Sequence, residues 1–187
     1  VCSSELYKAP GLSRIELAER LGLDKATITN ICSELISKEY MEEELPDDGR
    51  RGGRRKIPLR INDAVGCVLG VEVQPEFITL NAIRPSGTVI LSDTTFRSVR
   101  GGAAAEAIRD AIGAFLADPR LRRVRLLGIG IGMRGIVDPA KGAIVFSRPL
   151  TVDKPLEVAE HLKNAFGVPV FIVNDVKRCC YGLLAAD

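Results

Sequence analysis

Six side chains on one predicted helix have the chemistry for reading DNA bases: Lys25, Ala26, Thr27, Thr29, Asn30 and Ser33. An asparagine can form two hydrogen bonds to adenine. A methyl group of Ala or Thr can contact thymine, and a lysine can reach guanine or a phosphate. Ile28, Ile31 and Leu35 recur at helical spacing and give the helix an apolar side. We therefore expect the polar side chains to point outward, as in a recognition helix that enters the major groove.

A second group of residues could bind the DNA backbone. Four arginines surround a pair of glycines, at Arg50, Arg51, Arg54 and Arg55. A flexible cationic loop of this kind suits phosphates or a narrow minor groove. Strands expected at 41–45 and 57–61 would make the loop the tip of a hairpin, which is a wing. The alternatives are a solvated charge run for the loop and a protein-interaction module for the helices.

The elements that must position these residues are short helices with strong end signals. Ser13 and Glu16 have the spacing of a capping box, and Gly22 is expected to end that helix. Asp24 is expected to cap the next helix. Two helices joined by about three residues form a helix-turn-helix. Residues 1–8 are expected to be the remnant of an earlier helix.

A change of pattern near residues 62 and 63 predicts two domains, 1–62 and 63–187. The first is the winged helix-turn-helix. In the second we expect strands at 67–73, 77–83, 89–95, 124–131, 143–146 and 168–173, and helices at 103–116, 155–166 and from 176 onward. Three hairpin-linked strands followed by alternating helices and strands predict an α/β domain, with a mixed sheet and helices on its faces.

Composition excludes several other classes of protein. The longest nearly uncharged apolar stretch, 126–133, is too short for a membrane span of about 20 residues. The five cysteines include no Cys-x-x-Cys pair, and His161 is the single histidine, so no local zinc site can form. We expect a cytoplasmic protein with reduced thiols, no metal and no membrane contact.

Six segments together resemble one family of regulators. They are residues 13–18, 23–29, 52–56, 69–72, 128–138 and 173–175. In order and spacing they are similar to the repressors of the ROK family, a name that stands for repressors, open reading frames and kinases. The likeness covers nearly the whole chain. It implies a winged helix-turn-helix followed by the first lobe of an actin-like, sugar-kinase-like ATPase fold.

The resemblance also implies a function and partners. It implies a DNA-binding repressor of carbohydrate genes that binds operator DNA as a homo-oligomer, either dimer or tetramer, and responds to a sugar or sugar phosphate. A second lobe and a zinc loop rich in cysteine and histidine would lie beyond Asp187, so no cofactor is expected within this sequence. The alternative is a ROK-type sugar kinase with an N-terminal extension.

The resemblance places a ligand site at Asn174, Asp175, Arg134 and Gly135. Asp175 matches the position of the family's catalytic base, which in a repressor would hydrogen-bond the ligand together with Asn174. A helix cap after a strand is the alternative for that pair. Arg134 stands where proline is usual. Together with Arg148 and Lys177 it favours an acidic or phosphorylated effector, and a degenerate site is the alternative.

The chain is expected not to be an enzyme. The family's kinases hold nucleotide phosphate with a turn of small residues after the first strand of this domain. Here Gln74, Pro75 and Glu76 follow that strand and bring bulk, a missing N–H and a negative charge. A phosphate cradle needs backbone N–H groups that a phosphate can approach.

Overall fold

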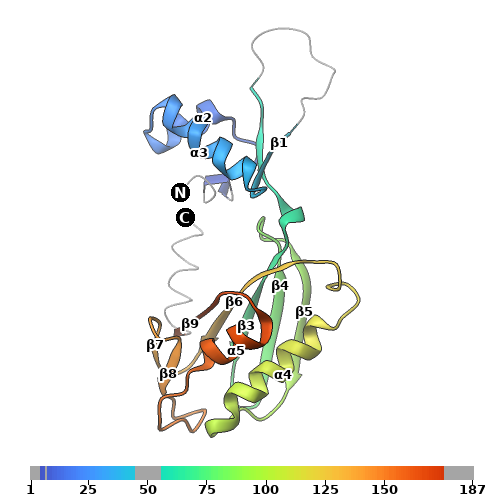
Figure 1. Ribbon diagram of the computed structural model, residues 1–187, viewed down its shortest axis with the longest axis vertical. Coiled ribbons are helices and arrows are strands. Elements are labelled where there is room, and N and C mark those ends of the chain that lie inside the picture. Colours follow the sequence, from blue (N-terminus) through green and yellow to red (C-terminus); the bar gives the residue numbers. More distant parts are fainter. Residues whose placement is uncertain (1–4, 7, 45–55, 175–187) are drawn as a thin grey trace. The chain divides into compact units, whose positions relative to one another are not determined.

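The computed structural model describes residues 5–6, 8–44 and 56–174 (Figure 1). The chain divides into two compact units. The first comprises Val1–Val65 with Pro85–Gly87, and the second Gly66–Arg84 with Thr88–Asp187. The functional domain limits 1–62 and 63–187 stay a prediction.

Two capped helices organise the first unit, α2 (Arg14–Leu21) and α3 (Lys25–Ser37). The predicted capping box is confirmed at α2. The Ser13 N–H donates to the Glu16 carboxylate over 2.8 Å, and the Ser13 hydroxyl oxygen accepts from the Glu16 N–H over 3.4 Å. Gly22 ends the helix with a φ of 62°, a left-handed conformation that costs glycine little. Glu5, Leu6 and Lys8 are also helical.

Two short antiparallel strands, β1 (Met41–Glu43) and β2 (Leu59–Ile61), follow α3 in this unit, and a 3-10 helix, η1 (Asp63–Val65), comes after β2. The two strands are shorter than the expected 41–45 and 57–61. Pro58 lacks an N–H for a ladder bond and forms an isolated bridge with Ser13. The core of the unit consists of Leu6, Leu17, Ala18, Ile28, Cys32, Met41 and Leu59.

A mixed five-stranded sheet organises the second unit, in the order β5-β4-β3-β6-β9. Its strands are β3 (Cys67–Val73), β4 (Phe77–Ile83), β5 (Val89–Phe96), β6 (Leu126–Met133) and β9 (Val170–Asn174). β3, β4 and β5 are antiparallel, whereas β6 is parallel to both β3 and β9. The mixed sheet expected from the sequence is confirmed.

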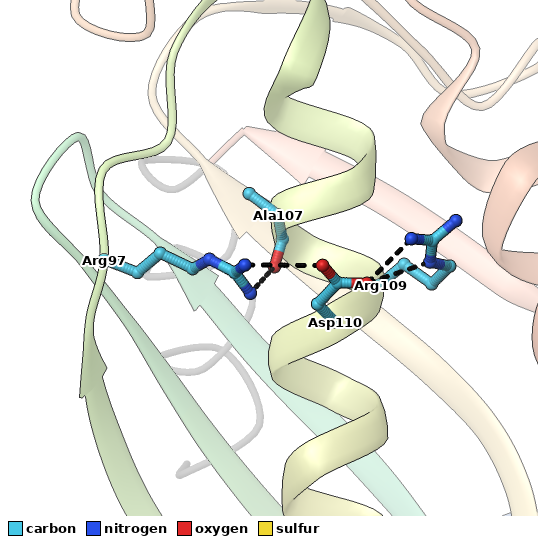
Figure 2. A network of polar contacts seen from close by, with 4 residues as sticks. All are labelled: Arg97, Ala107, Arg109 and Asp110. Atoms are coloured by element: carbon cyan, nitrogen blue, oxygen red, sulfur yellow. Dashed lines mark hydrogen bonds and ion pairs between the residues drawn. The ribbon is translucent and has the colours of Figure 1, made fainter.

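One face of this sheet is covered by α4 (Ala104–Leu116) and α5 (Val158–Phe166), which lie on the same side of it (Figure 1). Alternate residues of β3 point to this face, so Leu69, Val71 and Val73 are buried. Ile108 and Ile112 of α4 are buried in the same core. An ion-pair network connects α4 to the segment after β5: Arg97 donates to the Ala107 carbonyl and to Asp110, each over 3.3 Å (Figure 2).

Several element boundaries differ from the prediction, among them the start of β9 at Val170 rather than at residue 168, and one strand was missed. β6 begins at Leu126 rather than at residue 124, because the Val124 N–H donates to the Leu121 carbonyl in a turn. α5 begins at Val158 rather than at 155, because Leu156 pairs with Ile144 of β8 (Ala143–Phe146). A strand missed in the sequence, β7 (Ile136–Asp138), pairs with β8. The helix expected from residue 176 lies outside the described residues.

Candidate nucleic-acid interface and ligand site

The exposed face of α3 carries most of the predicted base-reading residues. Ala26, Thr29, Asn30 and Ser33 are all exposed, and their spacing of three, four and seven residues puts them on one side of the helix. Ile28 and Cys32 are fully buried on the other side. Lys25 is exposed and Thr27 is half-buried. The outward orientation that a base-reading role requires is therefore present, and the role itself stays a prediction.

The start of α3 is held by Asp24. Its carboxylate accepts the backbone N–H groups of Ala26 and Thr27, each over 2.9 Å, and a short hydrogen bond from the Thr27 hydroxyl. These donors, the Thr27 hydroxyl first, lower the pKa of Asp24 below its ordinary value because they stabilise the charged form. The Thr27 hydroxyl therefore supports the helix start.

The polar side chains on the exposed face of α3 differ in whether they already form a hydrogen bond within the protein. The Thr29 hydroxyl donates to the carbonyl of Lys25, one turn back, over 2.7 Å. Within the described part of the chain, the side chains of Asn30 and Ser33 form no hydrogen bond. The Asn30 amide and the Ser33 hydroxyl are thus available to an external partner.

Ion pairs fix the base of the predicted wing. Arg14 of α2 pairs with Glu43 of β1 over 2.8 Å, and Lys56 pairs with Glu16 over 2.8 Å. Arg60 pairs with Glu44 over 3.3 Å. Two of the acidic side chains before the loop are thus neutralised by cations of the same unit. The predicted contacts at Arg50, Arg51, Arg54 and Arg55 lie outside the described residues.

The stability of this unit is expected to depend on pH through the ionisation of Glu16. The hydrogen bond from Lys56 and the bonds from Ser13 lower the pKa of Glu16 from 4.5 to about 2. A carboxyl group whose pKa is lowered on folding stabilises the fold above its unfolded pKa, and that stabilisation is lost as the pH falls through the folded value. Between pH 4.5 and 2, the stability advantage of the parent over Glu16→Gln should shrink and vanish.

Urea unfolding of both proteins across this pH range checks the prediction, and NMR titration of the Glu16 carboxyl group gives its pKa directly. Glutamine keeps a side-chain acceptor for the capping box but has no charge. A difference between the two proteins that did not depend on pH would contradict the ion-pair assignment.

The predicted ligand residues meet where the parallel strands β6 and β9 end. The Asn174 amide donates to the Gly135 carbonyl over 2.8 Å. Gly135 has a φ of 144°, and a Cβ atom there would lie 2.6 Å from the Phe146 carbonyl oxygen. Arg134 is exposed beside it. The carboxyl ends of parallel strands are the usual ligand position in open α/β sheets. Asp175 lies outside the described residues.

Ser147 is a member of this constellation that the sequence did not indicate. Its side chain is fully buried, and its hydroxyl donates to the Arg134 carbonyl over 2.6 Å. Together Ser147 and Asn174 fix the backbone of the turn at residues 134 and 135. The bond of Ser147 to Arg134 joins residues thirteen apart in the chain, so no local sequence pattern signals this role.

The turn after β3 is bonded to the segment that follows β5. The Gln74 side chain is buried and its amide donates to Glu72 over 3.1 Å. The carbonyls of Pro75 and Glu76 accept backbone N–H groups from Val99 and Arg97, each over 2.9 Å. The turn thus has a proline without an N–H and, beside it, a buried glutamine side chain that is bonded to Glu72.

Neither a metal site nor a membrane span is found in the described part of the chain. No group of three or more His, Cys, Asp or Glu side chains there could hold a metal ion. No helix among these residues has the length and apolar character needed to cross a membrane.

Family comparisons match both units. The ROK family model matches residues 70–184, and the MarR family model matches residues 4–51. The Xylose repressor of Bacillus subtilis is 28% identical over 181 residues, which cover 95% of this chain and 46% of that protein. The N-acetylglucosamine repressor of Escherichia coli is 26% identical over 167 residues, which cover 89% of this chain and 41% of that protein. The chain spans less than half the length of these curated relatives.

Solved structures agree on the fold. The crystal structure of a ROK family transcriptional regulator, a homologue of the E. coli MLC protein, superposes with a TM-score of 0.73 at 23% identity, over 92% of this chain and 45% of that one. A ROK family glucokinase from Streptomyces griseus matches 65% of this chain and 37% of its own, with a TM-score of 0.53 and 22% identity. The winged helix-turn-helix and the partial actin-like, sugar-kinase-like fold are thereby confirmed.

Proposed function

Because the chain belongs to the ROK family, we propose that it is the DNA-binding and effector-sensing part of a transcriptional repressor of carbohydrate genes. The observation that carries the proposal is the exposed face of α3, where Ala26, Thr29, Asn30 and Ser33 lie together in a winged helix-turn-helix unit. The relatives named as repressors support the same function.

The partner is double-stranded operator DNA. Lys25, Thr29, Asn30 and Ser33 would contact base edges, with Ala26 and Thr27 beside them. Arg50, Arg51, Arg54 and Arg55 would contact phosphates or the minor groove. Two-fold pairing of subunits would set two recognition helices on one face of the DNA. We propose a homo-oligomer for this reason.

The effector would bind at the ends of β6 and β9. Asn174, Gly135 and Arg134 are adjacent there, and Ser147 fixes the turn that carries two of them. The amide of Asn174 and the cation of Arg134 suit a sugar or sugar phosphate, with Asp175 as a further acceptor. Two relatives are named for xylose and N-acetylglucosamine. D-xylose and N-acetylglucosamine are thus the first probes to add to a DNA-binding measurement.

A sensing role without catalysis fits the turn after β3. A phosphate cradle requires N–H groups that face the ligand, whereas this turn contains Pro75, which has no N–H, and the bulky, buried Gln74. The chain is therefore proposed to be a regulator rather than a kinase. Isothermal titration calorimetry tests this part of the proposal, and binding of ATP to the chain would contradict it.

Two kinds of substitution should affect DNA binding differently. Asn30→Ala is expected to relax specificity at one base step by about 1–3 kcal/mol, because the bidentate contact to adenine is lost. The double substitution Arg54→Ala and Arg55→Ala should weaken binding to all DNA sequences alike. It should also reduce the slope of log affinity against log salt concentration by nearly one unit per lost phosphate contact. Fluorescence anisotropy with a duplex selected from a random pool, and with random DNA, at several salt concentrations measures both effects.

The matched control for the arginine pair is Arg122→Ala with Arg123→Ala, which removes the same charge from an exposed segment of the second unit. This control should leave both the affinity and the salt slope close to those of the parent. If the parent protein bound no duplex more tightly than random DNA, the repressor function would be wrong.

A further inference from the structure

The α3 face contains two methyl groups beside one amide, and this arrangement identifies a base preference. We propose that the γ-methyl group of Thr29 contacts the 5-methyl group of a thymine, and that the Thr29 hydroxyl takes no part in base recognition. This inference rests on the proposed DNA-binding function. Thr29 would then be a specificity-determining residue for thymine over cytosine at its position.

The hydroxyl of Thr29 is already bonded within the helix. It donates its hydrogen to the Lys25 carbonyl over 2.7 Å. A threonine in a helix that bonds back to the preceding turn keeps its hydroxyl against the backbone. The side chain is nevertheless exposed, so the methyl group is the part of Thr29 that remains for a partner.

The neighbours of Thr29 on this face strengthen the inference. Ala26 lies one turn earlier on the same side and presents only a methyl group. Asn30 is adjacent, exposed and without a side-chain hydrogen bond among the described residues. Asparagine pairs with adenine and a methyl group packs on thymine, so this face suits consecutive A·T pairs in the major groove.

Ser33 is the contrasting residue of the same face. Its hydroxyl is exposed and has no hydrogen bond in the described structure. A hydroxyl-mediated contact to a base or phosphate therefore belongs to Ser33 rather than to Thr29. Loss of the hydroxyl is therefore expected to weaken DNA binding at Ser33 but not at Thr29, whereas the thymine–uracil distinction should depend on Thr29 alone.

The experiment removes one methyl group from each partner in turn. A duplex selected from a random pool by the chain is remade with uracil in place of each thymine, one at a time, which deletes only the 5-methyl group. Affinities are measured for the parent, Thr29→Ser, which loses the methyl group, and Thr29→Val, which loses the hydroxyl. Ser33→Ala is the control, and circular dichroism verifies that each variant is folded.

For the parent we expect at least one thymine whose replacement by uracil weakens binding about threefold to fivefold, the effect of one buried methyl group. Thr29→Ser should bind the thymine duplex more weakly by a similar factor and no longer distinguish thymine from uracil there. Thr29→Val and Ser33→Ala should both retain the distinction. This pattern is a coupling energy in a double-mutant cycle, and it assigns the contact to the methyl groups of Thr29 and of that thymine.

The opposite pattern would overturn the proposal: Thr29→Ser keeping the distinction while Thr29→Val loses it, or no thymine responding to uracil replacement. In either case sequence-specific binding of the selected duplex would still support the proposed function. Failure of the selection to yield any preferred duplex would instead contradict the function itself.

Discussion

Replacing Ile28 by alanine should lower the free energy of unfolding of the first unit by about 2–5 kcal/mol, the usual cost of truncating a buried aliphatic side chain. Ile28 is fully buried and packs in the core that α2 and α3 share with β1 and β2. A domain of fewer than about 70 residues rarely has more than about 3–5 kcal/mol of stability from its core. The variant is therefore expected to be largely unfolded in this unit near 37 °C.

Urea unfolding followed by circular dichroism measures the loss, and hydrogen exchange of α3 assigns it to the first unit. Ile15→Ala is the matched control, because it is the same substitution on the neighbouring helix at a side chain that is 41% exposed. The control should cost much less than Ile28→Ala. Equal losses for both variants would show that the burial of Ile28 does not determine the stability of α3.

The effect of Ile28→Ala on DNA binding should differ from that of Asn30→Ala. Unfolding removes the whole recognition surface, so the affinities for selected and random DNA should fall together. Asn30 lies on the opposite, exposed face, so its substitution should leave the unfolding curve within about 0.5 kcal/mol of the parent. Stability and specificity are thus expected to separate on the two sides of one helix.

Gly135→Ala is the second substitution with a large expected effect, a loss of about 2–5 kcal/mol in the free energy of unfolding of the second unit from backbone strain and overpacking. Gly135 has a φ of 144°, where a side chain is strained. A Cβ atom there would also lie 2.6 Å from the Phe146 carbonyl oxygen and 2.9 Å from the Ser147 Cβ atom, so the β7–β8 pair would have to move. The Asn174 bond to the Gly135 carbonyl should weaken with it.

Hydrogen exchange over residues 136–146 measures the local loosening, and the side-chain amide signal of Asn174 in NMR spectra reports the lost hydrogen bond. Gly130→Ala is the control, because Gly130 lies in the middle of β6 with no described atom within 4 Å of an added Cβ. Unchanged exchange and an unchanged Asn174 signal in Gly135→Ala would show that this glycine does not fix the turn.

Much of the first unit was predictable because its signals act over three or four residues. The bonds between Ser13 and Glu16, the left-handed Gly22 and the cap formed by Asp24 each depend on neighbours in the chain. The outward face of α3 follows from the same short-range periodicity. For this reason, the predicted exposure of Thr29 and Asn30 needed no knowledge of distant contacts.

The ligand site required the tertiary structure. β7 has three residues and is held by its pairing with β8, so no local pattern could indicate it. The burial of Ser147 and its bond to Arg134 join residues thirteen apart, and Asn174 reaches Gly135 across 39 positions.

The amino-acid sequence by itself thus determined the helix ends, the polar face of α3 and the alternation of β3, because each of these follows from local backbone chemistry. Only the tertiary structure decided which side chains meet at the ends of β6 and β9 and which cations neutralise Glu43 and Glu44. Those contacts depend on how the strands align, and that alignment is selected by burial of the whole core rather than by any single segment.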